Sequence, residues 1–179
     1  MNKNVEANEI FTCEELDNIR RMAEQGDAEA QFTLGEYYYE STWEEKETIP
    51  HEEAYREASK WFHKSAEQGH EWAQFRLGNC YALAVGVKYN REESDKWYRK
   101  AAEQGLAAAQ CAVALHYSFQ ENDKQEAVKW FRLAAEQGDE FSLNELAYFY
   151  RNGIGVEKDE EKAAMLYKKL EEIRIQEED

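Results

Sequence analysis

The tetrapeptide Ala-Glu-Gln-Gly occurs four times in this chain, and its recurrence constrains the fold more than any other feature. The copies end at Gly26, Gly69, Gly105 and Gly138, at intervals of 43, 36 and 33 residues. Self-similarity with a period of roughly 20–50 residues is typical of arrays in which every repeat is one unit of supersecondary structure. The 179 residues are therefore better counted in repeats than in globular domains.

The residues that follow each tetrapeptide predict a helix. A small, an apolar and an aromatic residue recur at i, i+4 and i+8, a spacing that forms one stripe on an α-helix and on no strand. The small residue beside the stripe would let a second helix approach closely; it is Gly35, Gly78, Ala114 or Ala147. The stripes are Ala30, Leu34 and Tyr38; Ala73, Leu77 and Tyr81; Ala109, Val113 and Tyr117; and Ser142, Leu146 and Tyr150.

A second helix is predicted in each repeat from the segments EASKWFHKS, ESDKWYRKA, EAVKWFRLA and KAAMLYKKL. Their inward residues recur at i, i+3, i+4 and i+7, which is an amphipathic face. The glycine of the tetrapeptide is expected to take the left-handed position that ends this helix. The inward sets are Ala58, Trp61, Phe62 and Ser65; Ser94, Trp97, Tyr98 and Ala101; Ala127, Trp130, Phe131 and Ala134; and Ala163, Leu166, Tyr167 and Leu170.

The intervals between the tetrapeptides differ only because the turn between the two helices of a repeat differs in length. The boundaries of the repeats can therefore be assigned. Residues 1–26 are expected to form an N-terminal capping helix, with Leu16, Ile19 and Met22 turned inward. The repeats then span 27–69 with an acidic insertion at 40–53, 70–105, 106–138, and 139–179 with a C-terminal capping helix. Asn90 and Asp159 are placed to cap second helices, and Pro50 to lie in the first turn of one.

Charge and missing motifs exclude several functions. With 38 acidic and 22 basic residues the net charge is −16, which disfavours nucleic acid and anionic membranes as partners. No catalytic motif is found, and the four histidines never share a helix face with other ligands at metal spacing, so we expect no enzyme, no cofactor and no metal site. Cys80 and Cys111 are expected to be buried thiols. No signal peptide or apolar span is evident, which suits a cytoplasmic protein or a substrate of signal-independent secretion.

These repeats resemble the Sel1-like repeat family, a relative of tetratricopeptide repeats. Residues 23–172 carry the three parts of the family pattern, which are A-x-A-Q-[YF]-x-L-G-x-x-Y, a G-x-G-V turn and K-W-[YF]-x-K-A-A-E-Q-G. Repeat 1 departs from it in its turn, where the insertion removes the glycines; repeat 3 lacks the turn and both glycines, and repeat 4 lacks the final tetrapeptide. The resemblance implies an all-α fold, a right-handed α/α superhelix (solenoid) of about four helix pairs. It also implies a non-catalytic role in protein–protein interaction, as an adaptor or scaffold.

The family places its ligands in a concave groove lined by the first helix of each repeat. Trp72 and Phe141 stand where the family usually has small or charged residues. They are either binding hot spots or packing between repeats. The resemblance assigns to the groove, residue by residue, Phe32, Glu36, Tyr39, Trp72, Phe75, Asn79, Phe119, Phe141, Asn144, Tyr148 and Arg151.

Two functions fit this sequence. The first is an adaptor that binds a protein or peptide segment, where a basic stretch in the partner would suit the acidic chain. The alternative is an acidic immunity or inhibitor protein that neutralises one basic toxin or enzyme, which the small size and negative charge would also suit.

Overall fold

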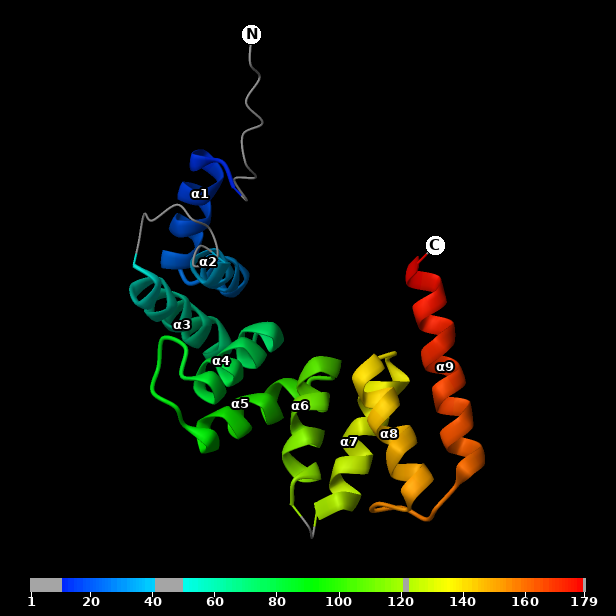
Figure 1. The fold of residues 1–179 in the computed structure, drawn as a ribbon. Coiled ribbons are helices and arrows are strands. Elements are labelled where there is room, and N and C mark those ends of the chain that lie inside the picture. Colours follow the sequence, from blue (N-terminus) through cyan, green and yellow to red (C-terminus); the bar gives the residue numbers. More distant parts are fainter. Residues whose placement is uncertain (1–10, 41–49, 121–122, 179) are drawn as a thin grey trace. The chain divides into compact units, whose positions relative to one another are not determined.

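A computed structural model describes residues 11–40, 50–120 and 123–178. Across those residues it contains nine α-helices and no strand (Figure 1), so the predicted all-helical fold class is confirmed. The helices are α1 (Cys13–Glu24), α2 (Ala28–Glu40), α3 (His51–Glu67), α4 (Glu71–Leu83), α5 (Arg91–Glu103), α6 (Ala107–Ser118), α7 (Lys124–Glu136), α8 (Glu140–Asn152) and α9 (Glu160–Glu178).

The helices fall into two compact units, divided between Arg91 and Glu92. In the first unit α2 packs against α1 and α3, and α3 packs against α4. In the second unit α6 packs against α7, α7 against α8, and α8 against α9. Within each unit, helices that are neighbours in the sequence are therefore also neighbours in space, as expected for repeats that contact only the next repeat.

The repeated tetrapeptide ends helices as predicted. Its four glycines have φ between 92° and 103°, a left-handed conformation that a side chain would strain. At the first copy, the Gly26 amide donates to the Ala23 carbonyl and the Asp27 amide to the Met22 carbonyl, the two bonds of a Schellman motif. The next helix begins two residues after every one of these glycines.

A ladder of glutamine side chains joins successive helices. The Gln31 amide donates to the carbonyl of Ala23, and Gln74 and Gln110 donate in the same way to Ala66 and Ala102. The glutamine of the tetrapeptide extends this ladder with a second hydrogen bond between side chains. The Gln68 amide donates to Gln31 Oε1 at 2.7 Å, and the Gln137 amide donates to Gln110 Oε1 at 2.9 Å. The ladder satisfies buried polar groups that would otherwise destabilise the helix junctions.

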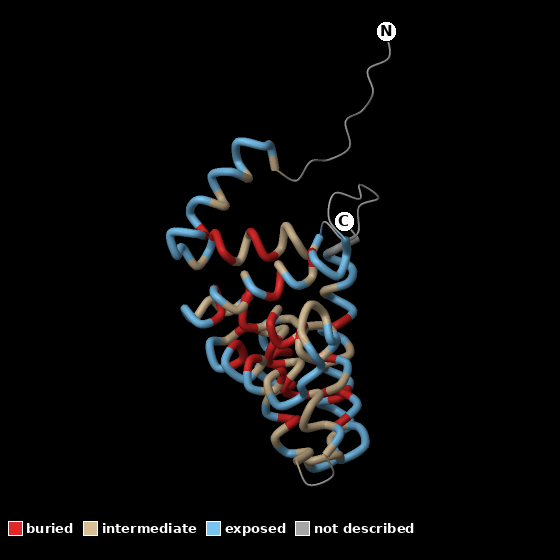
Figure 2. The backbone as a smooth tube through the Cα atoms, turned by 90° about the vertical axis from the view of Figure 1, so that its left-hand side faces the viewer, coloured by how far each residue is buried: buried red, intermediate tan, exposed pale blue. Residues whose placement is uncertain are grey.

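The core consists of small and aromatic side chains along the predicted stripes. Figure 2 shows buried residues recurring along the helices, with exposed residues between them. In the first unit the Phe62 ring is fully buried and lies where a Cβ on Gly35 would be only 2.6 Å from it. That contact supports the predicted close approach of paired helices.

The capping helix α1 buries fewer residues than predicted. Leu16 and Ile19 pack against the cluster of Ala23, Ala30 and Leu34, as expected for inward residues. Met22 was also predicted to point inward, but it is 38% exposed, so the apolar face of α1 is narrower than predicted.

The glycine-containing turns of repeats 2 and 4 pack onto the preceding second helix. A Cβ on Gly86 would lie 2.0 Å from the carbonyl oxygen of Tyr55, and one on Gly155 would lie 2.6 Å from that of Lys124. Both glycines therefore allow a backbone approach that no side chain would permit. After the second of these turns, the Asp159 carboxylate caps α9 by accepting from the Lys162 amide at 2.9 Å, as predicted.

The acidic insertion of repeat 1 is only partly covered by the structure. Glu40 is the last residue of α2, and residues 41–49 lie outside the described residues. Pro50 occupies the N-cap position of α3, one residue earlier than predicted. His51, Glu52 and Glu53, which were assigned to the insertion, instead form the first turn of α3, where acidic residues favour the helix dipole.

Candidate interaction surfaces

In the first unit, an aromatic pair lies on the exposed side of α4. Trp72 is 44% exposed, and its ring meets the half-buried Phe75 edge to face at a centroid distance of 6.2 Å. The small residues Ala73 and Gly78 lie on the buried side of the same helix. Asn79 lies one turn beyond Phe75 and is half-buried. The pair leaves a large apolar surface open to solvent on this helix.

Three other residues that the sequence assigned to a groove instead connect helices. Phe32 stacks on His70 at 4.5 Å, and Tyr39 lies 5.6 Å from the Tyr55 ring. Glu36 forms an ion pair with Arg76 at 2.6 Å, joining α2 to α4. These contacts hold the two repeats together, so the surface they offer to a partner is reduced.

Burial changes the acidity of this connecting cluster. It raises the pKa of Glu36, because loss of solvent penalises the carboxylate more than the Arg76 hydrogen bond and charge favour it. Burial likewise raises the pKa of Tyr39 and favours its neutral phenol. One carboxylate oxygen of Glu36 and the Nε of Arg76 are buried with no hydrogen-bond partner among the described residues.

In the second unit, four predicted residues share one exposed face of α8. Phe141, Asn144, Tyr148 and Arg151 are spaced by three, four and three residues, which aligns them along the helix. All four are exposed, with Phe141 at 48% and Tyr148 at 49%. The opposite side of α8 is buried in the core cluster of this unit. We call these four residues the α8 face.

Phe119 is the most exposed aromatic residue among those the sequence singled out. It follows α6 directly as the C-cap residue and is 80% exposed. Among the described residues, its ring has no contact with another aromatic ring.

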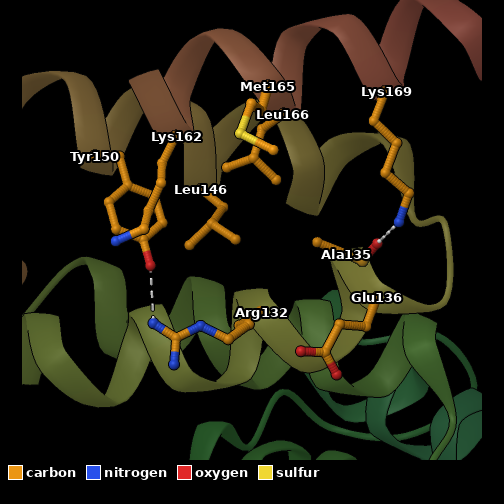
Figure 3. A pocket seen from close by; sticks show the side chains of 9 residues that line it. All are labelled: Arg132, Ala135, Glu136, Leu146, Tyr150, Lys162, Met165, Leu166 and Lys169. Atoms are coloured by element: carbon orange, nitrogen blue, oxygen red, sulfur yellow. Dashed lines mark hydrogen bonds between the residues drawn. The ribbon is translucent and has the colours of Figure 1, made fainter. Parts of the chain in front are cut away.

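The sequence analysis did not identify a hollow between α7, α8 and α9 (Figure 3). It has a volume of about 250 Å³ and contains three cationic side chains and one carboxylate around an apolar floor. A signal for it was present, because Met165 and Leu166 stand where repeats 1–3 carry Lys-Trp. The hollow is lined by Arg132, Ala135, Glu136, Leu146, Tyr150, Lys162, Met165, Leu166 and Lys169.

The cysteines show no sign of an activated nucleophile. Burial raises the pKa of Cys80 to about 12 and that of the half-buried Cys111 to about 11. Within the described ranges, no group of three or more His, Cys, Asp or Glu residues is placed to hold a metal ion. Over the same part of the chain, no helix is long and apolar enough to cross a membrane.

The model of the Sel1 repeat family matches the chain four times in succession, at residues 28–70, 73–106, 107–139 and 141–171. The chain belongs to the Sel1 repeat family. Proteins of this family are generally protein-interaction scaffolds and are typically non-catalytic. A comparison with curated proteins gives no match.

Solved structures of other Sel1 repeat proteins are similar to this chain. A protective antigen of uropathogenic Escherichia coli strains with an SLR fold is 36% identical over 88% of the chain, with a TM-score of 0.79. A Sel1 repeat protein from Oxalobacter formigenes is 33% identical over the same share, with a TM-score of 0.74. The chain spans 33% of the first protein and 61% of the second. A Pseudomonas aeruginosa protein, 16% identical with a TM-score of 0.51, shares the fold alone.

Proposed function

We propose that this Sel1 repeat chain binds a protein or peptide segment along the first helices of its repeats. The observation that carries this proposal is the α8 face, where two half-exposed aromatic rings lie in line with Asn144 and Arg151. Exposed aromatic and arginine side chains are the types most enriched at binding hot spots. The Tyr148 ring meets the buried Phe149 ring edge to face at 6.4 Å, yet about half of it stays open to solvent, as does about half of Phe141.

The aromatic pair Trp72 and Phe75 on α4 is proposed as a second contact region, within the first unit. Its two rings together offer an apolar surface that a buried anchor of a partner could cover. Asn79, on the same helix, and Asn144, on α8, would supply directional hydrogen bonds to a peptide backbone. Phe32, Glu36 and Tyr39 contribute mainly by holding α2, α3 and α4 together, while Phe119 offers a separate apolar contact.

The partner is proposed to carry a basic stretch beside apolar anchors. The net charge of −16 would attract such a segment over several ångströms and raise its association rate. The aromatic residues would then provide the short-range affinity that charge alone does not give. Binding of this kind weakens with added salt mainly through the association rate, because ions screen the long-range attraction.

An inhibitor of one basic toxin or enzyme is the second candidate, and the strong negative charge is the observation that favours it. An inhibitor would capture a single basic protein tightly, whereas an adaptor would bind several proteins of one assembly. The two functions use the same helices, so they differ in the identity and number of partners rather than in the surface.

Photo-crosslinking from the α8 face tests the proposal. Tyr148 would be replaced by p-benzoylphenylalanine, and the chain would be irradiated in the source cells, after which crosslinked peptides would be identified by mass spectrometry. A peptide with basic and apolar residues is the expected adduct. Binding of the purified partner would then be compared for wild type, Phe141→Ala/Tyr148→Ala and the control Leu133→Ala, which truncates a residue 43% exposed on α7.

The double variant should lose at least about tenfold in affinity, and Leu133→Ala should bind as wild type does. Equal affinity for all three proteins would mean that the α8 face is not the contact surface. A thermal melting curve of each variant checks that the fold is retained. We expect it to be retained because the rings of Phe141 and Tyr148 are each about half-exposed.

A further inference from the structure

We propose that the hollow between α7, α8 and α9 binds a small aromatic carboxylate, independently of the protein partner. The fourth repeat differs from the others at the tryptophan position of its second helix. The second helices carry Lys-Trp at Lys60–Trp61, Lys96–Trp97 and Lys129–Trp130, but Met165–Leu166 in repeat 4. The tryptophan in this register packs inward: Trp97 is 4% exposed, and Trp130 packs against the core cluster of its unit.

Replacing that indole by the smaller Leu166 leaves space. The floor of the hollow is formed by Leu146, which is 3% exposed, and by the half-buried Leu166. Met165 lies at the open side and is 66% exposed. The volume of about 250 Å³ is below the roughly 300–1,000 Å³ of pockets that hold drug-sized ligands. A compact aromatic system of one or two fused rings, with a short polar substituent, therefore suits it better than a larger molecule.

The polar groups are segregated at the two ends of the hollow, as Figure 3 shows. At one end Arg132 donates to the Tyr150 hydroxyl at 2.9 Å, and Lys162 reaches over the Tyr150 ring at 5.4 Å from its centroid. At the other end Lys169 donates to the Ala135 carbonyl at 2.9 Å. The carboxylate of Glu136 lies along α7 between this contact and Arg132. The apolar floor separates these two groups.

The charges favour an anion at the Arg132 end. Lys162 is already paired with Asp159 at 2.9 Å, but the hydrogen bond to Tyr150 is the one polar contact of Arg132 with another described residue. A guanidinium has five N–H donors in a planar fork that matches a carboxylate, so most of its capacity is available. Lys169 already donates to the Ala135 carbonyl at the opposite end. A carboxylate at Arg132 would lie with its ring over Leu146 and Leu166.

The preceding repeat provides a matched control. Arg99 donates to the Tyr117 hydroxyl at 2.7 Å, the same contact as Arg132 with Tyr150, 33 residues earlier in the chain. There the register of Leu166 is occupied by Trp130. The arginine–tyrosine contact therefore recurs in two repeats, and the two places differ in the residue beside it, which is Trp130 in one and Leu166 in the other.

The probe for the test is indole-3-acetate, whose ring matches the missing tryptophan side chain. Binding would be measured by calorimetry and by the ¹³C-methyl signal of Met165, against the neutral indole-3-acetamide. We expect saturable binding of the anion with a ring-current shift of the Met165 methyl, and binding of the amide at least about tenfold weaker.

Variants then locate the site. Leu166→Trp restores the residue of the other repeats and should abolish binding while the protein stays folded. Arg132→Ala should weaken binding of the anion by at least about tenfold, whereas Arg99→Ala should leave it unchanged. The proposal is overturned if millimolar probe shows no saturable binding, if Arg132→Ala and Arg99→Ala behave alike, or if the amide binds as well as the anion. Because Arg132 is exposed, its variant decides the question even if Leu166→Trp fails to fold.

Discussion

Gly35 and Phe62 meet at the centre of the first repeat, where a Cβ on the glycine would lie 2.6 Å from two atoms of the ring. Phe62 is fully buried, so its ring has little room to move. Alanine is favoured over glycine within a helix by about 1 kcal/mol, but overpacking of a core costs about 1–3 kcal/mol. The steric cost is the larger of the two, so the glycine stabilises the helix pair despite its poor helix propensity.

Gly35→Ala is therefore expected to lower the free energy of unfolding by up to about 2 kcal/mol, the difference between the two terms, measured by urea denaturation. In a Phe62→Leu background the same substitution should cost less, because the smaller side chain relieves the clash. An additive result in this double-mutant cycle would show that the two side chains do not compete for the space.

The glutamine ladder predicts a second energetic coupling. Gln110→Ala removes the donor to the Ala102 carbonyl and the acceptor for Gln137 at once. We expect a loss of about 0.5–1.5 kcal/mol for each hydrogen bond removed, because the Ala102 carbonyl still accepts from the Gly105 amide and Gln137 still donates to the Gly105 carbonyl. Gln137→Ala, at an exposed position, should cost less, and the two changes together should cost less than their sum. Thermal and urea unfolding of the single and double variants would measure this, and strict additivity would contradict the ladder.

The thiols predict a pH dependence with a definite sign. Because burial raises the pKa of Cys80 from 9.0 to about 12, its contribution to stability is intact below pH 9 and is lost as the pH rises towards 12. The unfolding free energy of wild type should fall more steeply above pH 9 than that of Cys80→Ala. At neutral pH a thiol reagent should modify the exposed Cys13 rapidly and Cys80 only on unfolding. Rapid modification of Cys80 in the folded protein would contradict its burial.

Much of the fold could be predicted because the same helix-pair pattern occurs in four repeats, so each helix could be checked against its counterparts in the other repeats. The tetrapeptide identified the helix ends, since its glycine has a conformational role that is visible in sequence. The prediction that Met22 points inward was wrong. Met22 follows the apolar spacing of Leu16 and Ile19 along α1, but that spacing does not show how wide a strip of α1 the packing against α2 covers. Residues 51–53 of the insertion lie in the first turn of α3, because the insertion lengthens that helix as well as the turn before it.

The candidate site was harder to predict than the fold. The resemblance assigned Phe141 and Tyr148 to a groove, and in the structure both are exposed on one side of α8. The resemblance does not reveal which of the assigned residues the next repeat covers, so Phe32, Glu36 and Tyr39 were grouped with exposed positions although they contact α3 and α4. The hollow in repeat 4 depends on the absence of one large side chain, and a comparison of the four repeats at the tryptophan position would have indicated it.

That same comparison between repeats yields a stabilising substitution. Ala84 follows α4 with φ of 57°, in the left-handed region, whereas the corresponding residue of repeat 4 is Gly153 with φ of 68°. A left-handed conformation costs a non-glycine residue roughly 1–2 kcal/mol, of which the greater flexibility of glycine in the unfolded chain offsets a part. Ala84→Gly should therefore stabilise the protein by up to about 1 kcal/mol, and Gly153→Ala should destabilise it by a similar amount. Melting curves of both variants measure this, and the pair would fail as a prediction if the two changes shifted the midpoint in the same direction.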